Sequence, residues 1–333
     1  MSVRAIGRAF AEPFRSGGRT DGLLVAVYVV INALVALNAV VHDPGIGYDA
    51  FWHLEYIAHL AKGHLVSFEE THEFFSPPLA YAVPALTKGL FGLSTVVAGK
   101  LAQLLNVGCS LGTTWLVLRL GARIDQESRW LRLVALLTLG CLPVYYRSFA
   151  FVRGEPYVAF FLTAVVYLVV RMLGTGQRTI RSGVLLGLTL GLAFLSRQWA
   201  FLIVPGLLGV AGILAVRRPG ERMRIAALVG TAMVVAAVTA GWFYLSLKVR
   251  YGSATAWNRG GESTFRLANN PGSFYVGTGD GELFRKPVRG SFEAPSPGLN
   301  SQGPVESARS PADDTATQAG PQESFPVDGG FPS

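Results

Sequence analysis

Charged residues are scarce in this sequence: Asp, Glu, Lys and Arg make up only 15% of its 333 residues, whereas 50% are hydrophobic. A water-soluble chain needs about a quarter of its residues charged to cover its surface. The apolar residues are gathered in blocks of about 20, the length that crosses the hydrocarbon core of a bilayer. The sequence therefore predicts an all-α, polytopic membrane helix bundle, because helices satisfy their own backbone hydrogen bonds in lipid.

Cysteine is also rare. Cys109 and Cys141 both lie inside apolar blocks, which excludes a disulfide framework and a cysteine-based zinc site. The net charge of +8 does not indicate a nucleic-acid partner, because the basic residues occur in short runs between apolar blocks. Basic runs in those places are typical of membrane topology signals.

The apolar blocks predict about seven transmembrane helices. They cover residues 22–41, 97–118, 131–149, 156–173, 183–196, 199–216 and 225–247. The first block is interpreted as an uncleaved span, because no small-residue cleavage site precedes His42. The fifth is short for a span and needs tilting, bilayer thinning or cover from neighbouring helices. Gly183, Gly187 and Gly191 within it stand four apart, which predicts a helix face that a neighbour packs closely against.

The distribution of Lys and Arg predicts a cytoplasmic N-terminus in a multi-pass plasma-membrane protein. With that orientation, most basic residues lie in cytoplasmic segments and span ends: Arg4, Arg8, Arg15, Arg19, Arg119, Arg123, Arg129, Arg132, Arg171, Arg178, Arg181, Arg217, Arg218, Arg222 and Arg224. Far fewer lie outside before Lys248: Lys62, Lys88, Lys100, Arg147, Arg153 and Arg197. Counting the apolar stretch 79–93 as an eighth span would reverse this pattern, so we expect it to be an interfacial or re-entrant helix of the first outer loop.

The chain changes character after residue 250. Residues 1–250 form the predicted transmembrane domain, and residues 251–292 form a mixed outer segment. Residues 293–333 are rich in Pro, Gly and Ser and poor in large apolar side chains. Such a composition cannot bury a core, so a disordered tail is expected.

The first outer loop, residues 42–95, is the candidate site of chemistry. It holds every histidine of the chain: His42, His53, His59, His64 and His72. It also holds a concentration of acidic side chains: Asp43, Asp49, Glu55, Glu69, Glu70 and Glu73. Titratable groups gathered at one membrane face are typical of acid–base chemistry or metal binding, although an outer loop is also polar simply because it is wet.

Within this loop, residues 50–62 predict a short amphipathic helix. Its apolar side is expected to hold Phe51, Leu54, Ile57, Ala58 and Ala61. Asp49 stands at the N-cap, with His53 four residues on along the same side. Capping and catalysis by Asp49 both remain open from the sequence alone.

Five further polar residues belong to the same predicted face. Glu70 and His72 lie on a corner that Pro77 and Pro78 stiffen. A solvated acidic turn is the alternative interpretation. Arg153 and Glu155 precede the fourth span and Arg197 precedes the sixth, where cations beside carboxylates suit a phosphate leaving group or simply anchor the interface.

The order of these motifs resembles the GT-C glycosyltransferases, in particular the protein O-mannosyltransferase and aminoarabinose-transferase-like branch. The likeness is carried by Tyr48-Asp49 with His53, by Ser76-Pro77-Pro78-Leu79, by Arg153-Gly154-Glu155-Pro156 and by the segment 191–197, within residues 22–250. It implies a membrane enzyme that transfers a sugar from a polyprenyl-phosphate donor to a lipid, glycan or protein acceptor on the non-cytoplasmic face.

The resemblance also implies roles for individual residues. Asp49 would be the general base, and Glu70 and Glu155 further catalytic or acceptor-positioning carboxylates. The implied substrate-binding residues are His53, His72, Arg153 and Arg197, with both arginines contacting phosphate. The His and carboxylate set permits either a divalent metal or none.

Two other functions are consistent with the sequence. Family members generally continue with further spans, so the polar tail favours a truncated, non-catalytic homologue or an assembly partner. A transporter is the alternative from another class, but it usually needs ionisable or broken-helix sites near the bilayer midplane. The predicted spans carry almost no charge away from their ends.

Overall fold

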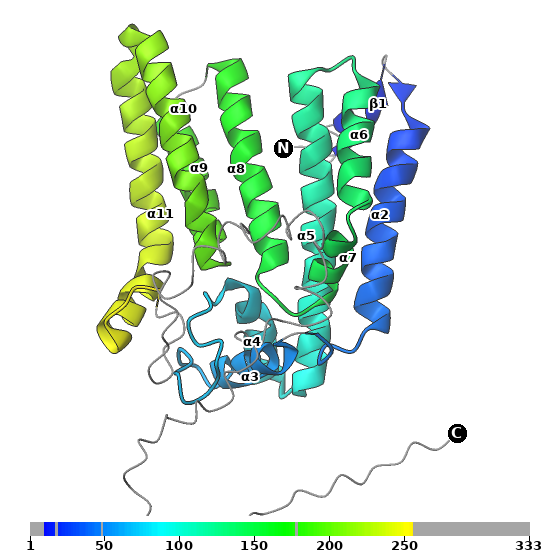
Figure 1. Ribbon diagram of the computed structural model, residues 1–333, viewed down its shortest axis with the longest axis vertical. Helices are drawn as coiled ribbons and strands as arrows, with labels where there is room; N and C mark the ends of the chain where they lie inside the picture. The colour runs from blue at the N-terminus through cyan, green and yellow to red at the C-terminus, as the bar shows by residue number, and fades with distance from the viewer. Residues whose placement is uncertain (1–9, 17–18, 48, 177–178, 256–333) are drawn as a thin grey trace, which may run out of the picture. The chain divides into compact units, whose positions relative to one another are not determined.

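A computed structural model describes residues 10–16, 19–47, 49–176 and 179–255 (Figure 1). The described residues all belong to the first of two units, Met1–Ser263 and Thr264–Ser333. The predicted segments 251–292 and 293–333 therefore lie outside the described residues, apart from 251–255. The elements are η1 Glu12–Phe14, β1 Arg15–Ser16, β2 Arg19–Thr20, α2 Gly22–Val41, α3 Ala50–Leu60, α4 Leu79–Phe91, α5 Thr95–Ile124, α6 Arg129–Gly140, α7 Pro143–Ala150, α8 Glu155–Thr175, α9 Ile180–Phe194, η2 Gln198–Leu202, α10 Ile203–Arg217, η3 Pro219–Glu221 and α11 Arg222–Tyr251.

The described chain is mostly helical, and five of its helical stretches are long and apolar enough to cross a membrane. They are α2, α5, α8, the η2–α10 stretch and the η3–α11 stretch. α6 and α7 would make a sixth only as a broken pair, because they are bent by 62° at Cys141–Leu142. Pro143 begins α7 there and cannot donate the backbone hydrogen bond that would continue α6.

Seven spans are therefore not confirmed. The fifth predicted span corresponds to α9, which has 15 residues and a length of about 22 Å at 1.5 Å per residue. That length falls short of the roughly 30 Å hydrocarbon core. α9 lies beside α8 and α11 within the bundle (Figure 1). These neighbouring helices cover it, as expected for so short an apolar helix.

The two short helices of the loop between α2 and α5 lie across one end of the bundle (Figure 1). α4 has 13 residues and a proline, Pro84, in its interior. It is about 20 Å long and too short to be an eighth span, as expected. The turns that join α5 to α6 and α10 to α11, the end of α8 and the start of α9 lie at the opposite end (Figure 1). The arginine-rich turns are thus separated from the histidine-rich loop.

The apolar side predicted for α3 is partly wrong. Phe51 is 61% exposed, and the face that packs against α4 and α5 contains Ala50, His53, Tyr56 and Ile57. These positions share one side of a helix at spacings of three and four residues. The polar His53 and Tyr56 occupy that face because their polar atoms find partners inside the loop.

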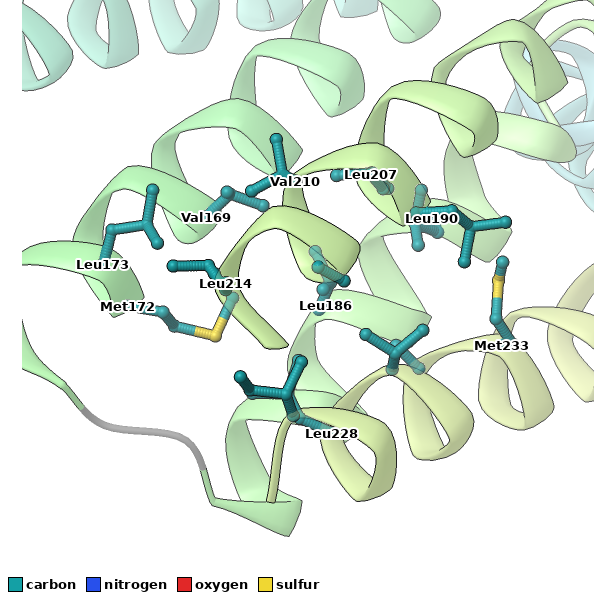
Figure 2. A pocket seen from close by; sticks show the side chains of 15 residues that line it. Val169, Met172, Leu173, Leu186, Leu190, Leu207, Val210, Leu214, Leu228 and Met233 are labelled. Atoms are coloured by element: carbon teal, nitrogen blue, oxygen red, sulfur yellow. The ribbon is translucent and has the colours of Figure 1, made fainter. Parts of the chain in front are cut away.

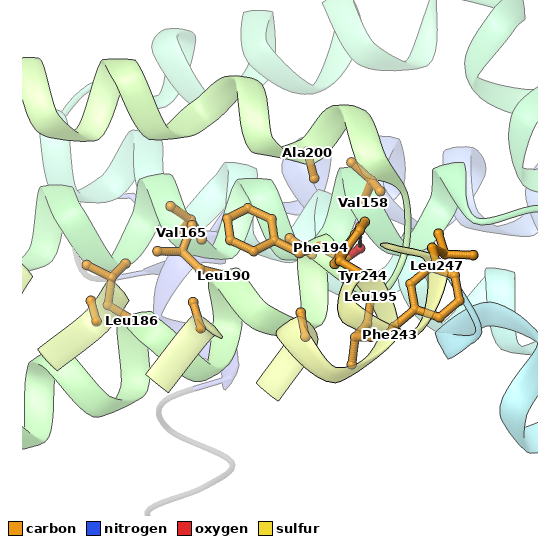
Figure 3. Close-up of a cluster of buried hydrophobic side chains, with 14 of the residues drawn as sticks. Val158, Val165, Leu186, Leu190, Phe194, Leu195, Ala200, Phe243, Tyr244 and Leu247 are labelled. Atoms are coloured by element: carbon orange, nitrogen blue, oxygen red, sulfur yellow. Dashed lines mark hydrogen bonds between the residues drawn. The ribbon is translucent and has the colours of Figure 1, made fainter. Parts of the chain in front are cut away.

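Three hydrophobic clusters stabilise the described fold. The largest joins α8, α9 and α11 through residues such as Leu190, Phe194 and Tyr244 (Figure 3). A second joins α2, α5, α6 and α7, and a third lies between α3, α4 and α5. The second and third clusters share α5, so this 30-residue helix connects the bundle to the loop helices.

A small cavity of about 70 Å³ lies between α8, α9, α10 and α11 (Figure 2). Its lining side chains are entirely apolar: Val169, Met172, Leu173, Leu186, Leu190, Leu207, Leu208, Val210, Ala211, Leu214, Ile225, Leu228, Val229, Ala232 and Met233. A ligand site needs a few convergent polar groups to orient its ligand. We therefore interpret this cavity as a packing gap and not as the functional site.

The glycine face predicted in the fifth span is confirmed, and its partner is α11. A Cβ atom added at Gly183 would lie 2.8 Å from the carbonyl oxygen of Leu228, and one at Gly187 would lie 2.5 Å from that of Ala232. At Gly191 the nearest atom would be Cβ of Thr239, at 2.5 Å. Glycine at these positions lets the two backbones approach directly.

Gly187→Ala is expected to lower the free energy of unfolding by about 1–3 kcal/mol, because the new methyl group meets a backbone carbonyl that cannot rotate away. Gly206→Ala on α10 is the matched control, since nothing lies within 4 Å of that position and alanine favours helix there. Detergent titration of the purified protein measures both changes. Equal stability of the two variants would contradict the close packing of α9 and α11.

Candidate active site at the loop end of the bundle

A cavity of about 360 Å³ opens at the end of the bundle where α3 and α4 lie. Four separate segments line it: the start of α3, the loop before α4, the start of α8 and the break between α9 and α10. Its lining residues are Asp49, His53, Glu73, Phe75, Ser76, Pro77, Arg153, Glu155, Arg197, Gln198 and Trp199. Five of the seven residues predicted for the site thus converge on one cavity.

Asp49 enters the cavity because of an unusual backbone turn. Its φ of 61° is the one positive value at a non-glycine position among the described residues, in a region that aspartate tolerates better than most side chains. Gly47, two residues earlier, has φ 131°, and a Cβ there would lie 3.0 Å from the ring of Phe151. The chain can therefore pass over Phe151 only with glycine at this position.

The Asp49 side chain does not cap the helix that it precedes. It occupies the N-cap position of α3, yet it accepts no capping hydrogen bond. Burial and the nearby Glu73 raise the pKa of its carboxyl, against the opposing effect of Arg153, Arg197 and His72. The sequence left capping and catalysis open for Asp49. Because the carboxylate does not cap α3 and lines the cavity, it is available to a ligand.

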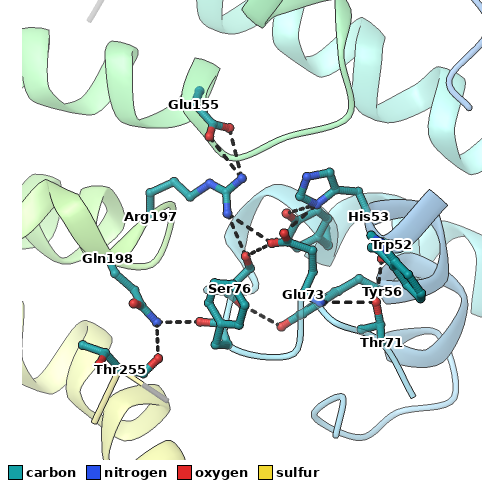
Figure 4. Close-up of polar contacts among 12 residues, drawn as sticks. Trp52, His53, Tyr56, Thr71, Glu73, Ser76, Glu155, Arg197, Gln198 and Thr255 are labelled. Carbon is teal, nitrogen blue, oxygen red and sulfur yellow. Dashed lines mark hydrogen bonds and ion pairs between the residues drawn. The ribbon is translucent and has the colours of Figure 1, made fainter. Parts of the chain in front are cut away.

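Arg197 is the centre of the polar contacts in the cavity (Figure 4). Its Nη1 donates to Ser76 Oγ at 2.7 Å and to Glu73 Oε2 at 3.3 Å. Its Nη2 pairs with Glu155 Oε1 at 3.1 Å. Gly154 makes this approach possible, because a Cβ there would lie 2.2 Å from the carbonyl oxygen of Ser196.

Glu73 is a member of the site to which the sequence analysis assigned no role. It is 9% exposed, and its carboxylate accepts a short hydrogen bond from the Ser76 hydroxyl in addition to the contact with Arg197. The turn from Glu73 to Ser76, closed by a backbone hydrogen bond of 2.7 Å, positions both side chains. The signal in the sequence was the proline pair that follows, which ends this turn at Pro77.

His53 lies at the inner wall of the cavity and is 1% exposed. Its Nδ1 shares a hydrogen bond of 2.8 Å with the hydroxyl of Tyr81 on α4. Burial, Arg197 and Arg153 together lower its pKa well below the ordinary value. These surroundings disfavour the charged imidazolium and suit His53 to hydrogen bonding.

Glu70 and His72 do not line the cavity. Glu70 Oε1 accepts from His64 at 2.8 Å and contacts His59 at 3.1 Å, while Oε2 accepts from the amide of Ser67 at 2.9 Å. His72 packs edge-on against Trp52, with ring centroids 4.3 Å apart. Glu70 and His72, the two residues predicted from the proline-stiffened corner, thus lie outside the cavity. Glu73 of the same corner lines it.

No group of three or more His, Cys, Asp or Glu side chains within the described part of the chain is arranged to hold a metal ion. The cavity combines its carboxylates with two guanidinium groups, and Arg197 already pairs with two of the carboxylates. A cation would have to displace these pairs. The donor set therefore fits an anionic or hydroxylated ligand better than a divalent metal.

No protein-family model, curated protein or solved structure matches this chain. The resemblance drawn from the short motifs thus stays a prediction, and the geometry of the cavity is the ground on which a function is proposed.

Glu70→Gln is expected to destabilise the loop by about 1 kcal/mol at neutral pH, through loss of charge-assisted hydrogen bonds. Burial alone would raise the pKa of Glu70, but the Ser67 amide and the His64 and His59 rings lower it from 4.5 to about 2. A lowered pKa stabilises the fold above pH 4.5 and loses that effect as the pH falls through about 2.

The difference in unfolding free energy between wild type and Glu70→Gln should therefore disappear across that acidic window. Proteolysis of the loop, followed against pH, measures the difference. A constant difference down to the lowest pH would contradict the assigned contacts of Glu70.

Proposed function

We propose that this chain is a multi-pass membrane glycosyltransferase, which moves a sugar from a polyprenyl-phosphate donor to a lipid, glycan or protein acceptor. One observation carries the proposal: the Asp49 carboxyl, with its raised pKa, lies in a cavity that also holds the guanidinium groups of Arg153 and Arg197. A base beside fixed positive charge is what transfer from a phosphate leaving group requires.

The reaction assigns a task to each of these groups. Asp49 accepts the proton of the acceptor hydroxyl as that oxygen attacks the anomeric carbon of the sugar. The bond between the anomeric carbon and the phosphate oxygen breaks, and polyprenyl phosphate leaves with the bonding pair. The negative charge that develops on the phosphate is stabilised by the guanidinium group of Arg153. A carboxyl whose pKa is raised is a stronger base in its ionised form.

Placement in the plasma membrane, with a cytoplasmic N-terminus, is part of the proposal. It is supported by the five long apolar helical stretches and by the position of the arginine-rich turns at the bundle end remote from the cavity (Figure 1). The positive-inside rule puts those turns in the cytoplasm. The cavity would then open on the non-cytoplasmic face.

A transporter is a weaker candidate for this fold. Charged side chains in the five long helical stretches are confined to their end regions. The polar groups buried between α2, α5 and α7 satisfy one another: Ser110 Oγ donates to Asn32 Oδ1 at 2.7 Å, and Asn32 Nδ2 donates to Thr114 Oγ1 at 3.0 Å. The hydrogen bonds of these three side chains thus join α2 to α5.

Asp49→Asn is expected to lower kcat by about 10²- to 10⁴-fold, the usual contribution of a general base, while helix content and expression stay unchanged. Transfer of radiolabelled sugar from a mixed polyprenyl-phosphate-sugar pool, by purified protein in lipid, measures it. Glu69→Gln is the control, because this carboxylate belongs to the same loop and is exposed.

Two outcomes would contradict the proposal in different ways. Wild-type turnover by Asp49→Asn would remove Asp49 as the base. No transfer by the folded wild type would favour a non-catalytic homologue or assembly partner instead.

The proposed orientation predicts which cysteines an impermeant thiol reagent labels in intact cells. In a background lacking Cys109 and Cys141, Glu69→Cys should be labelled from outside, and Glu127→Cys should be labelled only after permeabilisation. Both positions are exposed and lie at opposite ends of the bundle. The reverse pattern would place the cavity in the cytoplasm and would overturn the proposed face of reaction.

A further inference from the structure

Arg197, one of the two arginines that line the cavity, is already paired with acceptors of the chain itself. The side chain of Arg197 is 13% exposed, and both of its terminal nitrogens contact acceptors of the chain itself. Nη1 donates to Ser76 and Glu73 in the loop before α4, and Nη2 pairs with Glu155 in the first turn of α8 (Figure 4). The planar guanidinium group of arginine has donors in fixed directions, so it can bind two carboxylates on different segments at once. The single ammonium group of lysine cannot reproduce this arrangement.

Further hydrogen bonds join the segment 195–198 to the loop before α4. The amide of Leu79 donates to the carbonyl oxygen of Leu195 at 3.0 Å. Gln198 Nε2 donates to the carbonyl oxygens of Phe75 and Thr255 at 2.7 and 2.8 Å. The segment 195–198 therefore holds the loop before α4 from one side along its whole approach to that helix.

Charge balance argues against a direct role of Arg197 at the phosphate. Glu73 and Glu155 carry two negative charges against its single positive one, and Glu73 is 9% exposed. Breaking a buried pair by removing one partner costs about 3–5 kcal/mol, because the remaining charge stays desolvated. A phosphate that drew Arg197 away would leave both carboxylates in that state beside Asp49.

We propose that Arg197 is a positioning residue, which latches the loop 71–79 to the start of α8 around Asp49, and not a contact to the leaving phosphate. The latch presents Asp49 to the acceptor and offsets part of the charge of the two carboxylates, which would otherwise repel the phosphate more strongly. The catalytic part of this inference rests on the proposed function. The structural part concerns the latch alone.

Hydrogen exchange of the purified protein in lipid tests the latch without any activity. In Arg197→Lys, which keeps the charge but loses the fork, exchange at the amides of Ser76 and Leu79 should accelerate by about tenfold or more. Both amides donate to backbone carbonyls of the latch region, Glu73 and Leu195. In Arg197→Gln, the additional change Glu155→Gln should slow exchange again, because it removes one of the two carboxylate charges that lost their partner.

Steady-state transfer separates positioning from phosphate contact. We expect Arg197→Lys to lower kcat by about tenfold or more, with the KM for the polyprenyl-phosphate sugar changed less than about twofold.

The pH profile of transfer gives a second readout. In Arg197→Gln its acid limb should move to higher pH, because Arg197 lowers the pKa of Asp49. In Glu73→Gln the acid limb should move to lower pH, because Glu73 raises that pKa.

The outcomes of the two arms are distinguishable. Unchanged exchange in Arg197→Lys would overturn the latch, and a raised KM for the donor with intact kcat would show a phosphate contact instead. If the wild type transfers no sugar, the proposed function fails, yet accelerated exchange would still establish that Arg197 latches the loop to α8.

Discussion

The pairing of one buried arginine with two carboxylates is the interaction on which the site depends. Asp49, Glu73 and Glu155 lie around a cavity at the end of an apolar bundle, where a desolvated negative charge is costly unless it is compensated. Arg197 supplies that compensation from a position fixed in the backbone between α9 and η2. Because its partners come from the loop and from α8, the same contacts that balance charge also define the shape of the cavity.

The packing of α9 on α11 determines where that arginine lies. Three glycines allow the two backbones into direct contact, and the Tyr244 hydroxyl donates to the carbonyl oxygen of Phe194, the last residue of α9, at 2.6 Å. These contacts fix the axial position of α9, and Arg197 follows three residues after its end. Since α9 has only 15 residues, the chain leaves the helix close to the start of α8, where Arg197 reaches Glu155.

Much of the fold follows from features that a single sequence displays. Hydropathy located the five long helical stretches, and the shortness of the fifth block corresponds to the 15 residues of α9. The arginine pattern predicted that 79–93 is not an eighth span, and α4 is shorter than the five long stretches. The broken pair α6–α7 was taken for one straight span because hydropathy averages across Cys141–Leu142 and does not weigh the single proline that follows. The side of α3 that faces inward was partly misjudged, since hydrophobicity ranks Phe51 above His53 and takes no account of Tyr81 as a hydrogen-bond partner.

The sequence predicted those residues of the candidate site that lie at helix ends, because the order of the helices alone brings these ends together. Asp49, Arg153, Glu155 and Arg197 follow or precede helices that end on one face, so their convergence could be expected from the order of spans. Glu73 was missed because the side-chain directions within an acidic run depend on turn geometry that spacing does not encode.

The acidic run of the loop therefore divides into two groups with different physical roles. Glu70 faces two histidines and a backbone amide, a half-buried arrangement that stabilises the loop through local charge-assisted bonds. Glu73, three residues later, faces Arg197 and Ser76 in a buried place, where its charge acts on Asp49. The turn between them points the two carboxylates to opposite sides. Glu70 therefore stabilises the fold of the loop, whereas Glu73 raises the pKa of the candidate base Asp49.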